Sequence, residues 1–346
     1  MQKKLGVFAL ALAFAAMFSA QVLAEDTTLG IAIRTLTNPY QANYKVGGDL
    51  IAAKTGLPLV VLTCEGSSEK QVNDIKSLVA RTKGNVVFMI DPNEATDMLP
   101  IAMALEESGV YYSTWWNKPE GINVWDFPHW VTHMAYDGVA AGKKMGEVLF
   151  GTFKTPGKGK IVTIQGMLAN YANQSRYDGL KAALAENPGV QEVATESADW
   201  DRTKAYEKMK NLLIANPDID GVWCANDNMA LGVVEALRER GLAGKVMVTG
   251  CDGVDEVFTG IKNGEIAATV FQDSKYQAGI SLTHALAVKT GKLKMADIPN
   301  EKRQYFIEAV YVTKDNIAEF EEQYIKNTPE YDFDDMFGTF GRTMED

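Results

Sequence analysis

Short runs of β-branched and aliphatic residues alternate along the chain with longer segments in which apolar residues recur every three or four positions. Val72, Ile75 and Leu78 show the second pattern, which predicts a helix with one buried face. The short runs predict strands, and strands that alternate with helices are typical of a parallel sheet covered on both faces. The predicted strands are residues 29–35, 57–63, 86–90, 110–114, 131–135, 160–165, 192–197, 221–225, 246–250 and 267–271.

Two series of these strand–helix units are separated by the polar segment 152–160, which contains Pro156, Gly157 and Gly159. This segment precedes a predicted strand, whereas a nucleotide-binding glycine loop follows one, so it is expected to be a plain loop. The chain has 346 residues, which is more than one hydrophobic core usually organises. We therefore expect an α/β protein with two doubly wound parallel-sheet lobes.

The first residues follow the pattern of an export signal. Lys3 and Lys4 precede an apolar run over residues 5–18, and the small-residue site Val22-Leu23-Ala24 follows. The apolar run is shorter than the roughly 20 residues that a membrane span requires. We expect residues 1–24 to be a signal peptide and the mature protein to be periplasmic, in preference to the alternative of an uncleaved membrane anchor.

Charge and cysteine content narrow the classes of partner. The net charge is −11, and removal of Lys3 and Lys4 takes it to about −13, which argues against nucleic acid as a partner. Three cysteines do not form the dense, even set of a disulfide framework, so they are expected to be small buried hydrophobes. A bridge between Cys224 and Cys251 stays open as the alternative.

Polar and aromatic side chains gather where the predicted strands end. In an open parallel α/β sheet, ligands bind at the carboxyl ends of the strands. Amides and carboxylates can satisfy every hydroxyl of a sugar, and the less polar face of the ligand can lie on an indole. The sequence therefore predicts a site for a small polyhydroxylated ligand. The candidate residues are Arg34, Asn38, Tyr40, Asp91, Trp115, Trp116, Gln174, Arg176, Trp200, Asn226, Asp252 and Gln272.

Several of these residues have a structural alternative. Asp252 with Gly253 could form only a strand-to-helix turn, and Asn226 and Asp227 could serve partly as helix caps. The tryptophans could instead pack in the core, and Arg34 either reaches the ligand or only pairs with a carboxylate such as that of Asp91. His129 and His133 lie about 13 Å apart in an extended segment. No metal site and no cofactor are expected.

Five stretches of sequence carry a resemblance to a known family. They are residues 37–40 (TNPY), 198–202 (ADWDR), 225–232 (ANDNMALG), 250–253 (GCDG) and 268–272 (ATVFQ). Together they resemble the ribose-type periplasmic sugar-binding proteins of ABC importers, which share their fold with Lac repressor-like regulators. The likeness runs from about residue 29 to residue 313. It implies that six residues fall at sugar-contacting positions, namely Asn38, Tyr40, Trp200, Asn226, Asp252 and Gln272.

The chain departs from the ribose-type pattern in its first half. Trp115 and Trp116 stand where that family has an Asp-Arg pair, which puts ribose itself in doubt and favours another sugar or a polyol. Asp91 stands where the family usually has Asn, and Arg34 replaces a small polar residue. Near the family's clamping arginine, this chain offers either Gln174 or Arg176.

The resemblance also implies two lobes of the type I periplasmic binding protein fold, joined by a three-strand hinge near residues 136, 273 and 307. Lobe one is expected to comprise residues 25–136 and 273–306, and lobe two residues 137–272 and 307–346. For the acidic, aromatic tail over residues 329–346, the sequence leaves two alternatives open, packing on a lobe or partial disorder.

Solute is expected to bridge the lobes of a monomer, and the closed shape is then recognised by the membrane permease of an ABC importer. The alternative is a receptor that presents a sugar or autoinducer to a chemotaxis or signalling partner. An enzyme is not expected: Asp91 and Asp252 could be imagined as a glycosidase pair, but no raised-pKa acid, nucleophile elbow or metal motif accompanies them. A repressor needs an N-terminal DNA-binding motif where this chain has the export pattern.

Overall fold

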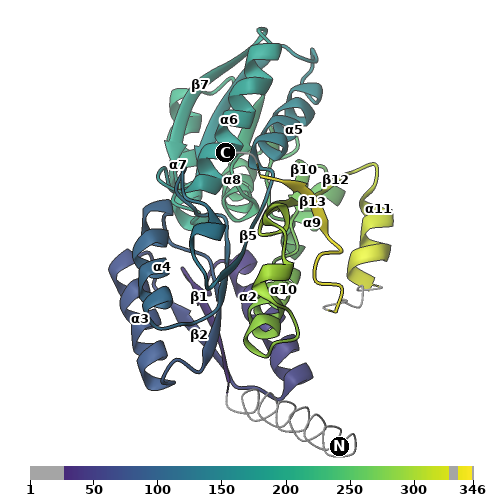
Figure 1. The fold of residues 1–346 in the computed structure, drawn as a ribbon. Coiled ribbons are helices and arrows are strands. Elements are labelled where there is room, and N and C mark those ends of the chain that lie inside the picture. Colours follow the sequence, from purple (N-terminus) through teal and green to yellow (C-terminus); the bar gives the residue numbers. More distant parts are fainter. Residues whose placement is uncertain (1–26, 327–333, 345–346) are drawn as a thin grey trace, which may run out of the picture.

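The protein consists of two α/β lobes stacked end to end, with β5 running toward the junction between them (Figure 1). The computed structural model describes residues 27–326 and 334–344. The expected signal peptide lies outside these residues. All ten predicted strands are present, with bounds shifted by a few residues, which confirms the predicted fold class.

Lobe one is built on a seven-stranded sheet of order β13-β11-β5-β4-β3-β1-β2, in which only β13 is antiparallel to its neighbour. Its strands are β1 (Thr28–Ile33), β2 (Leu59–Thr63), β3 (Val86–Ile90), β4 (Tyr112–Trp115), β5 (Trp130–Tyr136), β11 (Gln304–Ile307) and β13 (Phe340–Thr343). Its helices are α2 (Pro39–Thr55), α3 (Ser68–Arg81), α4 (Met98–Glu107) and α10 (Ser274–Lys289), with short 3₁₀ turns at Ala95–Asp97, Val124–Asp126, Met295–Asp297 and Asn300–Lys302. The strand β3 is completely buried, as expected for a strand covered by helices on both faces.

Lobe two is built on a six-stranded sheet of order β12-β10-β9-β8-β6-β7, in which only β12 is antiparallel. Its strands are β6 (Gly159–Gln165), β7 (Val190–Ser197), β8 (Gly221–Cys224), β9 (Met247–Thr249), β10 (Ile266–Phe271) and β12 (Val310–Thr313). Its helices are α5 (Gly138–Gly151), α6 (Tyr171–Glu186), α7 (Arg202–Ala215), α8 (Asp227–Glu239), α9 (Asp255–Lys262) and α11 (Ile317–Phe320), the last of which continues as a π-helical turn over Glu321–Lys326.

The chain passes between the lobes more often than three crossovers would require. It leaves lobe one after β5, returns after β10, and leaves again between β11 and β12. A further passage follows, because β13 pairs with β11 in the sheet of lobe one. The expectation that residues 307–346 all belong to lobe two is therefore wrong for residues 340–343. Phe337 also lies on lobe one, stacked on His284 of α10 with ring centroids 5.0 Å apart.

Close packing of α5 on α6 sets the position of one candidate site residue. Gly142 of α5 lies so near α6 that a Cβ atom built on it would be 1.8 Å from the backbone oxygen of Arg176. Any larger residue at position 142 would therefore push α6 away. The glycine brings the backbone of Arg176 deep into lobe two, so that its side chain begins in the interior.

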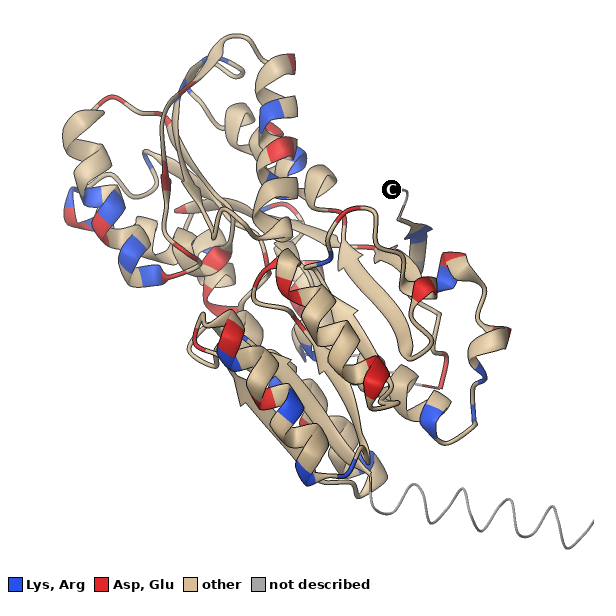
Figure 2. Ribbon diagram, turned by 60° about the vertical axis from the view of Figure 1, so that its left-hand side comes forward, with Lys and Arg blue, Asp and Glu red and all other residues tan. Residues whose placement is uncertain are grey.

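The remaining expectations concern surface and buried chemistry. The three cysteines are buried and free, so Cys224 and Cys251 are not bridged. His133 lies in β5 and bonds Thr114, and the described ranges contain no cluster of metal ligands. In the view of Figure 2, acidic and basic residues are interspersed along the helices that carry them. Within residues 27–326 and 334–344, every helix is too short or too polar to cross a membrane.

Candidate functional site

A pocket between the lobes is lined by residues of both. Lobe one contributes Arg34, Asn38, Tyr40, Gln41, Asp91, Pro92, Asn93, Trp116 and Asn117. Lobe two contributes Asn170, Ala172, Arg176, Trp200, Asn226 and Asp252. Nine of the twelve candidate residues lie in this lining, and they come from both lobes, from strand ends and from the adjoining helices α2 and α6. The pocket is thus a shared crevice, and neither lobe forms it alone.

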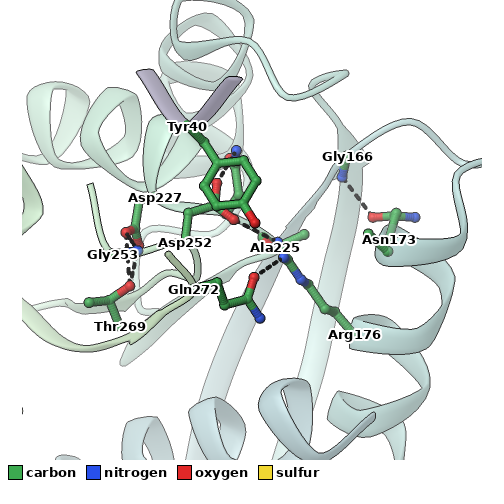
Figure 3. A network of polar contacts seen from close by, with 12 residues as sticks. Tyr40, Gly166, Asn173, Arg176, Ala225, Asp227, Asp252, Gly253, Thr269 and Gln272 are labelled. Carbon is green, nitrogen blue, oxygen red and sulfur yellow. Dashed lines mark hydrogen bonds and ion pairs between the residues drawn. The ribbon is translucent and has the colours of Figure 1, made fainter. Parts of the chain in front are cut away.

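Arg176 of α6 organises the lobe-two side of the pocket (Figure 3). Its Nη1 donates to the backbone oxygen of Ala225 at 2.8 Å and to Oδ1 of Asp252 at 3.1 Å, and its Nη2 donates to Oε1 of Gln272 at 2.8 Å. Asn226 donates from Nδ2 to the other oxygen of Asp252 at 3.1 Å. The guanidinium is thereby held flat and rigid between three chain segments. Its Nε atom is buried without a partner among the described residues.

Asp227 holds the backbone of the turn that carries Asp252. Its Oδ2 accepts hydrogen bonds from the backbone nitrogens of Gly253 and Val254 at 2.6 and 3.1 Å, and Thr269 donates to the same carboxylate. Burial, together with the nearby charge of Asp252, raises the pKa of Asp227. Burial also raises the pKa of Asp252, although the Arg176 charge opposes that rise. Asp227 is therefore the structural residue that fixes the 252–254 turn, whereas Asp252 faces the pocket.

Asn226 combines the two roles that the sequence left open. Its Oδ1 accepts from the backbone nitrogen of Met229 at 3.0 Å and caps α8, and the residue also lines the pocket. Asp252 has a positive φ of 131°, a backbone conformation that residues other than glycine rarely adopt. The turn is therefore strained at the residue that pairs with Arg176, a combination typical of functional sites.

Asp91 is the corresponding buried carboxylate of lobe one. Its Oδ2 accepts from Nε2 of Gln41 at 3.2 Å, and its Oδ1 from Nδ2 of Asn117 at 3.4 Å. Arg34 lies near enough for its charge to favour the ionised carboxyl, yet burial prevails and raises the pKa of Asp91 to about 7. The Nη1 of Arg34 donates across the crevice to the backbone oxygen of Asp199 at 3.1 Å. Arg34 thus lines the pocket and also links the lobes.

Other direct contacts join the two lobes beside the pocket. Asn170 of lobe two donates from Nδ2 to the backbone oxygen of Asn93 at 3.3 Å, and Asn117 of lobe one accepts from the backbone nitrogen of Tyr171 at 3.0 Å. With the Arg34 bond, these contacts hold the lobes against each other. The structure therefore shows the closed arrangement.

Two indoles flank the Arg176 guanidinium from opposite lobes. The guanidinium carbon lies 5.2 Å from the ring centroid of Trp116 and 5.8 Å from that of Trp200. Both tryptophans have left-handed backbone, with φ of 62° and 65°. Gly166 faces the Trp200 ring so closely that a Cβ atom there would clash at 2.3 Å. The backbone and its neighbours therefore fix the Trp200 ring in place.

Three candidate residues do not line the pocket. Trp115 is completely buried in the core, where its Nε1 donates to Oγ of Ser281 at 2.6 Å. Trp116 lies just past the end of β4 and has left-handed backbone, so its side chain diverges from that of Trp115. Gln174 is exposed and bonds the backbone of Leu168, because a residue two positions before Arg176 lies on the other side of the helix. Gln272 lies behind Arg176 and binds its guanidinium.

Four polar residues of the lining were not among the candidates, namely Gln41, Asn93, Asn117 and Asn170. Gln41, Asn93 and Asn117 lie in the same segments after predicted strands as Tyr40, Asp91 and Trp116, so the reasoning that selected those neighbours could have selected them. Asn170 is the N-cap residue of α6, in the loop that follows β6. It belongs to the lining because lobe closure brings it against Asn93.

Asp91 should make the stability of the unliganded protein depend on pH. Its pKa is about 7 in the folded state and near 3.8 in a model compound. A raised folded-state pKa contributes stability that is full below pH 3.8 and is lost as pH rises through 7. We measure the free energy of unfolding by urea at pH 5 and at pH 8. Between these two pH values, the wild-type protein is expected to lose on the order of 2 kcal/mol more of this free energy than Asp91→Asn does. Equal losses for the two proteins would contradict the burial-driven shift.

Comparison with known proteins agrees with this architecture. Residues 29–293 match the family described as periplasmic binding protein domain. A ribose import binding protein of Salmonella typhimurium is 33% identical over 271 residues, which cover 78% of this chain and 87% of that protein. A xylitol-binding protein of Mycolicibacterium smegmatis is 27% identical and covers 85% of this chain and 79% of its own length.

Solved structures show the same fold. The crystal structure of a twin-arginine translocation pathway signal protein from Burkholderia phytofirmans is 39% identical, covers 92% of this chain and 98% of its own, and superimposes with a TM-score of 0.89. An ABC transporter periplasmic solute-binding protein from Actinobacillus succinogenes with bound D-allose is 26% identical, covers 85% and 99%, and has a TM-score of 0.74. The family match spans both lobes and all the residues that line the crevice. The chain therefore belongs to the periplasmic binding protein domain family.

Proposed function

We propose that this protein is the solute-binding component of an ABC import system and that it captures a small, uncharged carbohydrate or polyol in the periplasm. The observation that carries the proposal is the crevice itself, in which buried amides, two arginines, two carboxylates and two indoles from both lobes converge. Such groups can both donate to and accept from sugar hydroxyls. The relatives named for ribose, xylitol and D-allose support this ligand class.

Charge within the crevice supports an uncharged ligand. Arg176 is paired with Asp252, and Arg34 lies in the field of Asp91. Lobe two also buries the Asp227 carboxylate beside Asp252, so neither lobe presents a cation without a nearby carboxylate. A sugar acid or a sugar phosphate would add a further negative charge to this site, which is costly when water is excluded.

Lobe closure supplies the signal for transport. A ligand that contacts both lobes binds the closed form more tightly than the open form, and so shifts the protein toward closure. The protein acts as a monomer. A membrane permease then distinguishes its closed form from its open form. Catalysis is not part of the proposal, because the buried carboxylates are tied to Arg176, Gln41 and Asn117 and are not placed as a free acid and base.

A thermal-shift screen of the mature protein against pentoses, hexoses, polyols and sugar acids tests the proposal. A true ligand present at a hundred times its dissociation constant should add about 2.7 kcal/mol to the free energy of unfolding. We expect neutral sugars or polyols to stabilise the protein and sugar acids to leave it unchanged. The proposal fails if every neutral compound is inactive, or if a bound compound is converted to product.

A further inference from the structure

Arg34 of lobe one makes a hydrogen bond to the backbone of lobe two. It follows β1, and its Nη1 donates at 3.1 Å to the backbone oxygen of Asp199, which follows β7. Asn93 and Asn117, which take part in the other two contacts beside the pocket, follow β3 and β4. In the sheet of lobe one, β1 and β4 lie on opposite sides of β3. The Arg34 bond therefore joins the lobes on a different side of the pocket from the other two contacts.

The oxygen that Arg34 contacts is fixed in position by lobe two itself. Asp199 and Trp200 have left-handed backbone, with φ of 52° and 65°, and Nδ2 of Asn228 donates to the backbone oxygen of Trp200 at 2.9 Å. The Asp199 carboxylate is engaged elsewhere, because its Oδ2 accepts from Nζ of Lys204 at 2.9 Å. The acceptor for Arg34 is thus a main-chain oxygen that is present whatever the charge of the Asp199 side chain.

Arg34 also lies between two spaces in the crevice. Together with Asn38 and Trp200, it lines both the pocket and an outer hollow that the two lobes share. Several residues of this hollow are exposed, among them Glu65 and Lys204, so the hollow opens to solvent. A solute that passes from the pocket into the hollow moves past the Arg34 guanidinium. Among the residues that the structure describes, this guanidinium donates only to Asp199, so it is free to move once that bond breaks.

We propose that Arg34 is a latch, a residue whose bond to Asp199 forms only when the lobes are closed and prolongs the closed state around a bound solute. The two bonded groups belong to different lobes, so opening of the hinge separates them. A hydrogen bond with a charged donor contributes more than a neutral one, which makes its loss measurable. This inference rests on the proposed function for the bound solute. Because both bonded groups are protein groups, the latch acts on every solute alike.

Stopped-flow tryptophan fluorescence with D-ribose, D-allose and xylitol measures how fast each bound compound leaves. Arg34→Met keeps the length of the side chain and removes its donors. Dissociation from this variant should be about tenfold faster than from wild type, by the same factor for each compound that binds. Arg34→Lys keeps one charged donor and should give intermediate rates.

Two results of this measurement would overturn the latch while the proposed function survives. The first is equal dissociation rates from wild type and Arg34→Met. The second is a set of factors that differ severalfold between compounds, because a direct contact of Arg34 with solute hydroxyls depends on their arrangement. Lys204→Met is the matched control. Lys204 lines the same hollow and also binds Asp199, but through the carboxylate and within lobe two, so its loss should leave the rates at wild-type values.

Small-angle X-ray scattering of the unliganded proteins tests the latch without any solute. Arg34→Met should have a larger radius of gyration than wild type, because its open form is more populated, and Lys204→Met should have the wild-type value. An unchanged radius in Arg34→Met contradicts the latch. If none of the three compounds binds and the wider thermal-shift screen is also negative, the proposed function fails, and the scattering result still decides whether Arg34 holds the lobes together.

Discussion

Replacement of Arg176 with leucine should lower the free energy of unfolding by about 3–5 kcal/mol and abolish binding of neutral sugars and polyols. The guanidinium is 3% exposed and makes three hydrogen bonds within lobe two. Leucine leaves the Asp252 carboxylate buried without its cation, beside the carboxylate of Asp227. Leaving one member of a buried ion pair unpaired is costly because neither water nor a neighbour compensates the charge. Urea unfolding and isothermal titration measure the two effects.

Arg202→Leu provides the control for this substitution. Arg202 also belongs to lobe two and also contacts carboxylates, those of Glu235 and Glu256, but its side chain is 34% exposed. Exposed ion pairs contribute about 0–1 kcal/mol, so this variant should unfold almost as wild type does and should bind ligand normally. Losses of similar size in both variants would show that the charge of Arg176 is not what holds the cluster together.

The sequence predicts the fold well because its strands are signalled locally. Runs such as Val86–Ile90 are continuous and apolar, and they follow helices with one clear buried face. The three strands that were missed are short, and two of them, β12 and β13, pair antiparallel at the sheet edges. Each owes its pairing to contacts with distant segments. The pairing of β13 with β11 joins residues far apart in the chain, and no local pattern indicates it.

The site is predicted less completely, for a reason that concerns side-chain direction. Strand ends indicate which segments meet at the crevice, but not which of two adjacent residues faces it. Trp115 and Trp116 are equivalent candidates in the sequence, and the positive φ at Trp116 is what separates them in space. Asn170 reaches the crevice only through closure of one lobe on the other. Such features depend on the assembled molecule.

Neutralising both members of the buried pair should separate stability from binding. Asp252→Asn alone leaves Arg176 without its counter-ion, so it should destabilise the fold and weaken ligand binding at least a hundredfold, by about 3 kcal/mol. Combined with Arg176→Leu, it removes both charges, and the double variant should recover roughly half of the stability that Arg176→Leu loses. Asparagine suits position 252 better than a larger apolar residue, because the backbone there has φ of 131°.

Binding should not recover in the double variant, since the ligand hydroxyls lose both the charged donor and the charged acceptor of lobe two. Urea unfolding of the four proteins in one buffer gives the coupling free energy between positions 176 and 252. Titration with the tightest-binding compound of the screen gives the affinities. If the losses in free energy of unfolding of the two single variants simply add up in the double variant, the pair contributes no coupling free energy to the fold. A double variant that binds as wild type does would remove Arg176 and Asp252 from the ligand site.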